Sequence, residues 1–218
     1  MINIAIDGPA GSGKTTVAKQ ISKILDILYL DTGAMYRACG LYALNEGVSV
    51  DDEQGVSALM EKLDLKIEYL NGAQHTILFG KDVSEDIRRN EVSSLASKIS
   101  VHKAVRLKML EMQREIASKT DCVLDGRDIG SFVLPNAEYK FFLTASVKVR
   151  AKRRYLELQA KGMEVDLNQL EQEIAERDHR DSTREIAPLT QAPDAEKIDT
   201  SNMTIEEVIN TILSRVKK

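Results

Sequence analysis

Short apolar runs that end at an acidic or hydroxyl residue alternate along the chain with stretches of helical periodicity. The runs cover residues 2–6, 27–30, 122–124, 139–143 and 197–198, followed by Asp7, Asp31, Asp125, Thr144 and Asp199. Apolar residues recur at helical spacing between the first two runs and again before the third. Short strands separated by helices are typical of an α/β fold. We therefore predict a five-stranded parallel sheet flanked by helices.

A different pattern interrupts this alternation after residue 64. Leu65, Ile67 and Tyr69 alternate with polar residues, Asn71-Gly72 has the composition of a hairpin turn, and a second short run covers residues 76–79. This pattern predicts a small β insertion.

Residues 147–193 form a second excursion with two charged helical stretches joined around Gly162 and Asp166. Their low apolar content is compatible with a lid that moves over a bound substrate. We expect a single domain with three parts: a core (residues 1–63, 100–147 and 190–218), an insertion (64–99) and a lid (148–189).

Polar residues that precede periodic stretches mark the expected helix starts. Asp51 and Ser84 are candidate N-caps. Thr204 and Glu207 have the spacing of a capping box before the last helix.

Composition narrows the class of protein. A chain of 218 residues that is 43% hydrophobic can bury a full core. It has no apolar run of about 18 residues and no signal-peptide pattern at its start, so we expect a cytoplasmic protein. The net charge of −4 argues against a nucleic-acid or membrane-surface binder. Cys39 and Cys122 are too few for a disulfide framework, and nothing demands an oligomer, so we expect a monomer.

The segment between the first strand and the first helix carries the G-x-x-x-x-G-K-[ST] pattern of a phosphate-binding loop. The predicted ATP-binding residues are Gly8, Pro9, Ala10, Gly11, Ser12, Gly13, Lys14, Thr15 and Thr16. Glycines let backbone N–H groups approach phosphate oxygens, and the helix N-terminus adds positive potential. Lys14 is expected to reach the β and γ phosphates.

The same loop predicts a magnesium site. Thr15 is the expected Mg²⁺ ligand, and Asp125 at the end of a later strand is the expected acidic partner, acting through water. Alternatively, Asp125 is an ordinary strand-terminal aspartate that caps the next turn.

Arginines cluster in the predicted lid. Arg177, Arg180 and Arg184 share one face if the helix continues through them, as do Arg150, Arg153 and Arg154. They could be neutralised by Glu173, Glu176, Asp178 and Asp181 as in any salt-bridged helix. Together with a phosphate loop, the clusters favour transfer between two polyanions, where guanidinium groups offset repulsion.

A phosphate acceptor also fits the histidine content. A monophosphate already carries an ionised oxygen near pH 7 and needs no base. His75, His102 and His179 are scattered, form no catalytic array and are expected at the surface. Two other hypotheses remain open: a kinase of a small hydroxylated metabolite with Asp31 as the base, and a non-catalytic nucleotide switch.

Four motifs in order resemble those of one family. They are residues 6–14 (IDGPAGSGK), 30–37 (LDTGAMYR), 125–130 (DGRDIG) and 176–181 (ERDHRD) with Pro188-Leu189. Over essentially its whole length the chain is similar to the bacterial cytidylate kinases, which are nucleoside monophosphate kinases. The first motif is shared by many P-loop proteins, whereas the other three are specific.

The resemblance implies transfer of the γ-phosphate of ATP to CMP or dCMP. It assigns Arg37 and Arg127 to the acceptor phosphate, and Arg177, Asp181 and Arg184 to ribose and phosphates. Lys14, Arg127, Arg177 and Arg184 would be catalytic. Ser97, Arg106 and Asp128 would surround the cytosine, whose amine donor and ring acceptors suit these groups. Thr32 stands where the family has serine. Without the resemblance, Ser97 and Arg106 would be read as ordinary exposed helical residues.

Overall fold

A computed structural model describes residues 1–70 and 72–216. The chain divides into two compact units. Unit 1 contains Met1–Tyr29 and Thr120–Lys218, and unit 2 contains Leu30–Lys119.

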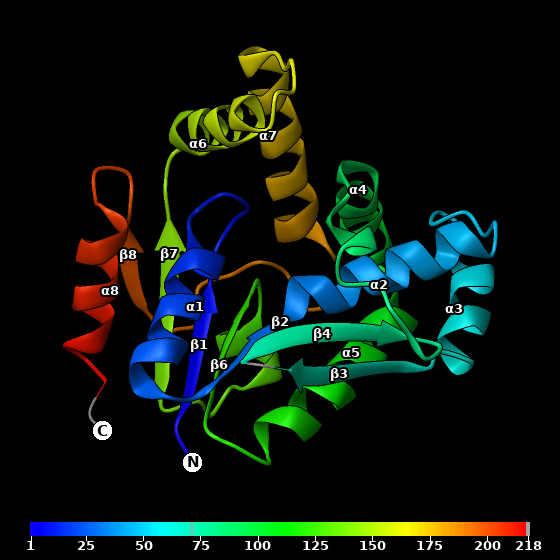
Figure 1. Cartoon of the computed structure of the whole chain (residues 1–218), viewed down its shortest axis with the longest axis horizontal. Coiled ribbons are helices and arrows are strands. Elements are labelled where there is room, and N and C mark those ends of the chain that lie inside the picture. The colour runs from blue at the N-terminus through cyan, green and yellow to red at the C-terminus, as the bar shows by residue number, and fades with distance from the viewer. Residues whose placement is uncertain (71, 217–218) are drawn as a thin grey trace. The chain divides into compact units, whose positions relative to one another are not determined.

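Unit 1 is built on the five-stranded sheet predicted from the sequence, with strand order β2-β6-β1-β7-β8 (Figure 1). β1 pairs in parallel with both β6 and β7, and β7 pairs in parallel with β8. The edge strand β2 begins in unit 1 and ends in unit 2. The strands are β1 (Asn3–Asp7), β2 (Leu28–Asp31), β6 (Cys122–Gly126), β7 (Tyr139–Thr144) and β8 (Glu196–Asp199), and the helical elements are α1 (Lys14–Leu25), the π-type turn η2 (Ile129–Val133), α6 (Val147–Ala160), α7 (Leu167–Thr183) and α8 (Ile205–Leu213).

Two helices share one apolar core with the sheet of unit 1. Val17 and Ile21 of α1 and Ile212 of α8 pack in the same buried cluster as Ile4 and Ile6 of β1. The near-continuous burial of β1 and β6 is typical of a parallel strand between two layers. This packing fixes the carboxyl end of β1, from which the glycine-rich loop leads into α1.

The charged excursion forms two helices with a small core of their own. Ala151 and Leu158 of α6 pack against Leu170 and Ile174 of α7. Gly162 adopts a φ of 74° in the connection, a conformation that favours glycine. Asp166 then begins α7, because its side chain accepts the Gln169 N–H at 2.7 Å. The predicted pair of joined helices is therefore confirmed.

Unit 2 combines four helices with a three-stranded antiparallel sheet of order β3-β4-β5. β3 and β4 pair from Leu65–Leu78 to Leu70–Ala73, which confirms the predicted β hairpin, although Asn71 of its turn lies outside the described residues. The elements are α2 (Thr32–Asn45), α3 (Glu53–Glu61), β3 (Leu65–Leu70), β4 (Ala73–Leu78), β5 (Lys81–Asp82), the 3₁₀ turn η1 (Asp86–Arg88), α4 (Asn90–Ile99) and α5 (Lys103–Ala117).

A glycine inside α2 permits close helix packing. A β-carbon at Gly40 would lie 3.1 Å from the Leu95 side chain and 3.2 Å from the Ala96 backbone nitrogen of α4. A glycine in a helix interior costs about 1 kcal/mol relative to alanine. Here it lets α4 approach the α2 backbone, and α4 carries Ser97.

The predicted helix starts were partly wrong. The N-cap of α3 is Asp52, whose carboxylate accepts the Gly55 N–H at 3.0 Å, rather than Asp51. Ser84 caps no helix, because its hydroxyl instead accepts the Thr76 N–H of β4 at 2.9 Å. The capping box of Thr204 and Glu207 is confirmed.

Both cysteines are free and buried. Burial raises the pKa of the Cys39 and Cys122 thiols to about 12, so both stay protonated at neutral pH. Among the described residues, no helix has the length and apolar character needed to cross a membrane.

Candidate active site

The phosphate loop leaves β1 at Asp7 and enters α1 at Lys14, as predicted. Its glycines are required by geometry. A β-carbon at Gly8 would lie 1.9 Å from the Leu143 carbonyl oxygen, and Gly13, the N-cap of α1, has a φ of 93°. The loop therefore closes against β7 and presents the N-terminal N–H groups of α1.

The Lys14 side chain is folded into this loop. Its Nζ donates to the Pro9 carbonyl oxygen at 2.7 Å and to the Ser12 hydroxyl at 3.3 Å. Burial lowers the Lys14 pKa, and the positive charge of Arg127 lowers it further. An anion in the loop would favour the charged ammonium and so reverse this shift.

Asp125 is directly linked to the loop. Its Oδ2 accepts the Thr15 hydroxyl at 2.7 Å, and its Oδ1 accepts the Tyr29 hydroxyl at 2.9 Å. The carboxylate is 5% exposed and belongs to strand β6. Both oxygens therefore accept side-chain hydroxyl protons, one from α1 and one from β2.

A second buried carboxylate holds the start of η2. Asp7 accepts the backbone N–H groups of Ile129 at 2.8 Å and Gly130 at 2.7 Å, one with each oxygen. Burial raises the pKa of Asp7 to about 7, which outweighs the lowering effect of the two N–H groups. Asp7 thereby ties the end of β1 to the residues that follow Asp128.

Arginines and aspartates of unit 1 form one buried network. Arg127 Nε donates to Asp181 Oδ2 at 2.9 Å, and Arg184 Nη2 donates to Asp128 Oδ1 at 2.9 Å. A longer ion pair of 3.9 Å joins Arg184 to Asp181. Four predicted site residues are thus brought together from the loop after β6 and from the end of α7.

Charges rather than solvent set the ionisation of this network. Burial raises the pKa of Asp181, but the charges of Arg127, Arg177 and Arg184 together overcome burial and lower it. The Asp181 charge in turn raises the Arg127 pKa against the opposing effect of burial. Opposite charges at short distance favour the ionised forms of both Arg127 and Asp181.

One prediction about this group was wrong. Arg184 does not continue the helical face of Arg177 and Arg180, because α7 ends at Thr183 and Arg184 has extended backbone angles. The Thr183 hydroxyl donates to the His179 carbonyl oxygen at 2.7 Å, and Arg184 Nε donates to the Ala187 carbonyl oxygen at 2.6 Å. Leaving the helix lets Arg184 reach Asp128.

Helix α6 also reaches the phosphate loop through Arg150, which is 3% exposed. The guanidinium donates to the Ala10 carbonyl oxygen at 3.0 Å and to Asp178 at 2.6 Å. Arg153 instead bonds to Thr200, and Arg154 pairs with Glu157 at 2.9 Å. Two acids of α7 therefore pair with arginines of other elements, Asp178 with Arg150 and Asp181 with Arg127.

Unit 2 carries four further predicted residues, Thr32, Arg37, Ser97 and Arg106. Arg37 of α2 pairs with Asp31 at 3.0 Å, while Asp31 also caps α2 by accepting the Ala34 N–H at 2.8 Å. Thr32 is buried at the start of the same helix. The alternative use of Asp31 as a catalytic base is not favoured, because the structure gives its carboxylate a cap and an ion pair.

Ser97 and Arg106 are not ordinary exposed helical residues. They are 4% and 2% exposed, and Arg106 ranks among the largest fully buried side chains. The Arg106 guanidinium carbon lies 5.7 Å from the centre of the Tyr36 ring, at the distance of a cation–π contact. A buried cation of this kind is unusual for a structural helix position.

The histidines take no part in these clusters, but two are less exposed than expected. His102 Nε2 lies 2.6 Å from the Val50 carbonyl oxygen, and His75 lies 2.7 Å from Asp82. His179 is exposed, as expected.

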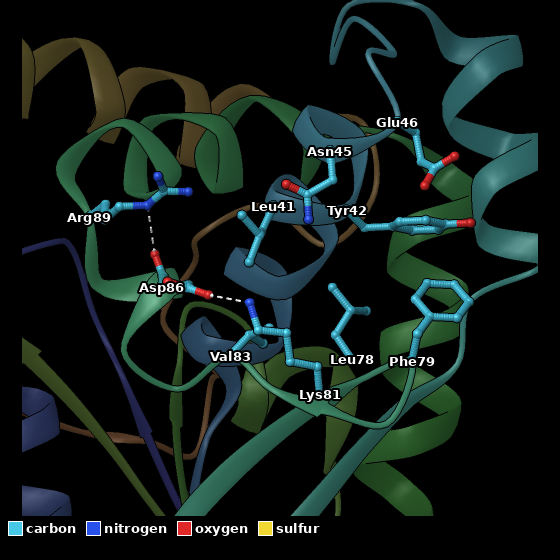
Figure 2. A pocket seen from close by; sticks show the side chains of 10 residues that line it. All are labelled: Leu41, Tyr42, Asn45, Glu46, Leu78, Phe79, Lys81, Val83, Asp86 and Arg89. Carbon is cyan, nitrogen blue, oxygen red and sulfur yellow. Dashed lines mark hydrogen bonds and ion pairs between the residues drawn. The ribbon is translucent and has the colours of Figure 1, made fainter.

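Unit 2 also contains a pocket of about 410 Å³ that involves none of the predicted site residues. Figure 2 shows the rings of Tyr42 and Phe79 on one side of the pocket. On another side, the Asp86 carboxylate accepts a hydrogen bond from Lys81 Nζ, and the Asp86 carbonyl oxygen accepts one from Arg89 Nε. The pocket is lined by Leu41, Tyr42, Asn45, Glu46, Leu78, Phe79, Lys81, Val83, Asp86 and Arg89.

Three contributors to the site were not singled out from the sequence: Asp7, Tyr29 and Arg150. Asp7 stands in the phosphate-loop motif, and Arg150 was grouped with other arginines by spacing alone. Tyr29 gave no signal, because its partner lies 96 residues away along the chain.

A glycine-rich loop between β1 and α1 of a parallel sheet, with a lysine and a hydroxyl at its end, defines the class of P-loop nucleotide-binding proteins. A shikimate kinase structure from Bacteroides thetaiotaomicron shares this fold with a TM-score of 0.52 and 14% identity, covering 98% of this chain and 97% of the other. That likeness concerns the fold alone.

The particular family follows from sequence. The family model described as cytidylate kinase matches residues 4–218. A cytidylate kinase from Shouchella clausii is 51% identical over 216 residues, covering 99% of this chain and 96% of the relative. Another from Pediococcus pentosaceus is 51% identical over 214 residues, covering 98% and 95%. The chain belongs to the cytidylate kinase family.

Proposed function

We propose that this protein transfers the γ-phosphate of ATP to CMP or dCMP, giving ADP and CDP or dCDP. The observation that carries the proposal is the buried network of Arg127, Asp181, Arg184 and Asp128 in the same unit as the phosphate loop. Family membership and relatives named cytidylate kinase support this substrate.

The phosphate loop is proposed to bind ATP. The backbone N–H groups of residues 10–16 would surround the β and γ phosphates, and Lys14 would exchange the Pro9 carbonyl oxygen for phosphate oxygens. The exchange is favourable because an ammonium binds an anionic oxygen more strongly than a neutral carbonyl.

Magnesium fits the oxygen donors beside this loop. The Thr15 hydroxyl and the Asp125 carboxylate lie 2.7 Å apart, and hard oxygen donors suit this ion. No group of three or more His, Cys, Asp or Glu side chains that could hold a metal is present among the described residues. That agrees with an ion held by few protein ligands plus phosphate and water. When bound, Mg²⁺ neutralises charge on the β and γ phosphates.

Arginines are proposed to stabilise the transferred phosphate. Arg127, Arg177 and Arg184 would supply guanidinium donors, and Arg37 and Arg127 would hold the acceptor phosphate. In unit 1, Arg127 and Arg184 already pair with aspartate carboxylates, so their guanidinium groups are placed to bind anionic oxygens. The acceptor needs no base, since its own oxygen is ionised near pH 7.

Ser97, Arg106 and Asp128 are proposed to recognise cytosine, and Thr32, Asp181 and Arg184 to contribute to the rest of the nucleotide. A carboxylate accepts from the exocyclic amine, and arginine and hydroxyl groups donate to O2 and N3. The burial of all three residues supports the assignment, because hydrogen bonds discriminate best away from water.

The proposal includes a single catalytic domain that acts as a monomer in the cytoplasm. Its parts would be the core, an insertion at residues 64–99 and a lid at residues 148–189. Lid closure would exclude water from the transferred phosphate.

A coupled assay of ADP release tests the reaction, with ATP against CMP, dCMP, UMP and AMP, and a panel of sugars and cyclic acids. We expect CMP and dCMP to be phosphorylated best. Turnover of a hydroxylated metabolite but not of CMP would overturn the proposal. Binding of a protein partner in response to nucleotide, without transfer to any acceptor, would instead indicate a switch.

Asp128→Asn tests the base pocket. This substitution keeps the size of the side chain but presents an amide donor toward the cytosine amine. We expect the KM for CMP to rise by about tenfold or more, with a much smaller change for ATP. An equal rise for both substrates would contradict the assignment of Asp128 to cytosine.

A further inference from the structure

We propose that Tyr29 is a positioning residue for the magnesium site, acting through Asp125 on the Thr15 hydroxyl. The inference rests on the proposed function, in which Thr15 is a Mg²⁺ ligand. It adds a residue of strand β2 to the machinery of the phosphate loop.

The Asp125 carboxylate is held from two sides. Tyr29 donates its phenolic proton to Oδ1 at 2.9 Å, and Thr15 donates its hydroxyl proton to Oδ2 at 2.7 Å. Because the carboxylate is 5% exposed, a rotation that breaks either bond has little water to replace it. The hydrogen bond from Tyr29 to Oδ1 thus fixes the orientation of the Asp125 carboxylate, and with it the direction in which Oδ2 points.

The direction of the second oxygen matters for the metal. A threonine hydroxyl has one proton and two lone pairs. While the Thr15 proton is committed to Asp125, the lone pairs are available to a cation. If the carboxylate turned away, the hydroxyl could rotate and present its proton toward the cation. Partners of metal ligands commonly tune affinity in this indirect way.

Tyr29 is itself held firmly enough to do this. Its ring packs against the apolar core that α1 and α8 share with the sheet, and Lys19 Nζ of α1 lies 5.7 Å from the ring centre. Its neighbour Leu28 donates its backbone N–H to the Asp121 carbonyl oxygen at 3.0 Å, next to β6. The phenol oxygen is therefore placed by the strand and by the phosphate-loop helix.

Tyr29→Phe removes the hydroxyl and leaves the packed ring. The test measures binding of the β,γ-imido analogue of ATP by calorimetry, once with Mg²⁺ and once with EDTA. We expect the gain in affinity that Mg²⁺ gives the wild type to fall about three- to tenfold in Tyr29→Phe, with affinity in EDTA unchanged. A purely structural role would lower both affinities together.

Tyr139→Phe is the matched control, because Tyr139 packs against the same core from β7. It should keep the full magnesium-dependent gain. In an Asp125→Asn background, Tyr29→Phe should cause no further loss, since the residue acts through the carboxylate.

The outcomes separate this inference from the proposed function. A wild-type protein whose affinity does not respond to Mg²⁺ overturns the proposed metal site and the role of Tyr29 with it. A magnesium-dependent gain that survives intact in Tyr29→Phe, or an equal loss in EDTA, overturns the role of Tyr29 alone.

Discussion

The end of strand β1 and the end of helix α7 each bury an aspartate, but in opposite electrostatic surroundings. Asp7 and Asp181 are both 4% exposed. Asp7 accepts two backbone N–H groups, whereas Asp181 bonds to Arg127 and faces the charges of Arg177 and Arg184. The pKa of Asp7 is raised to about 7 and that of Asp181 is lowered.

Equal burial therefore produces opposite shifts, because neutral dipoles and full charges differ in strength. Two N–H groups offset only part of the desolvation of Asp7, while three guanidinium groups overcome that of Asp181. The network around Asp181 is held together by full charges. A phosphate is also an anion and could bind the same guanidinium groups.

The largest expected effect comes from removing a cation from that network. Arg184→Met removes the guanidinium that pairs with Asp128 at 2.9 Å. It also removes one of the arginines that pair with Asp181. Breaking a buried pair on one side costs about 3–5 kcal/mol. We expect a loss of that size in the free energy of unfolding, measured by urea denaturation.

Arg154→Met is the control, because Arg154 pairs with Glu157 on the exposed side of α6. Exposed pairs of this kind contribute less than about 1 kcal/mol. If both variants lost the same stability, charge in the buried network would not be what holds the end of α7.

Much of the fold could be predicted because its signals are local. Each strand of the large sheet is an apolar run ended by Asp or Thr, and the loop motif marks the turn after β1. Local signals fail where two neighbouring residues are both suited to the same N-cap position. Asp51 and Asp52 are equally good N-caps in sequence, and only the backbone decides that Asp52 meets the Gly55 N–H.

The site was predictable where a motif carries it and not where long-range packing makes it. The phosphate loop is contiguous, so its residues could be named in advance. The end of α7 could not, because Arg184 leaves the helix to reach an aspartate 56 residues away. The burial of Ser97 and Arg106 depends on how α4 and α5 pack, which helical spacing alone does not fix.

A smaller effect is expected from neutralising the aspartate in the network. Asp181→Asn keeps an oxygen for Arg127 but removes the negative charge, and hydrogen bonds to charged groups contribute about 2 kcal/mol. Since the folded pKa of Asp181 lies below its usual value, its stabilisation is present above pH 4 or so and is lost as pH falls through the folded pKa. The difference in unfolding free energy between wild type and variant should therefore shrink from pH 5 to pH 3. A constant difference would mean that the charge of Asp181 is not stabilising.

The smallest effect should have the opposite sign of pH dependence and comes from Asp7→Asn. A folded pKa of about 7 lies above the unfolded value, so the stability that Asp7 contributes is present at low pH and is lost as pH rises through 7. Asparagine does not titrate, and all other groups cancel when the two proteins are compared. Between pH 6 and pH 8, the unfolding free energy of the wild type should fall relative to the variant by about 1 kcal/mol. Urea denaturation at half-unit pH steps measures this difference. If the difference stayed constant over this range instead, Asp7 would be charged in the folded protein throughout, and the contrast with Asp181 would disappear.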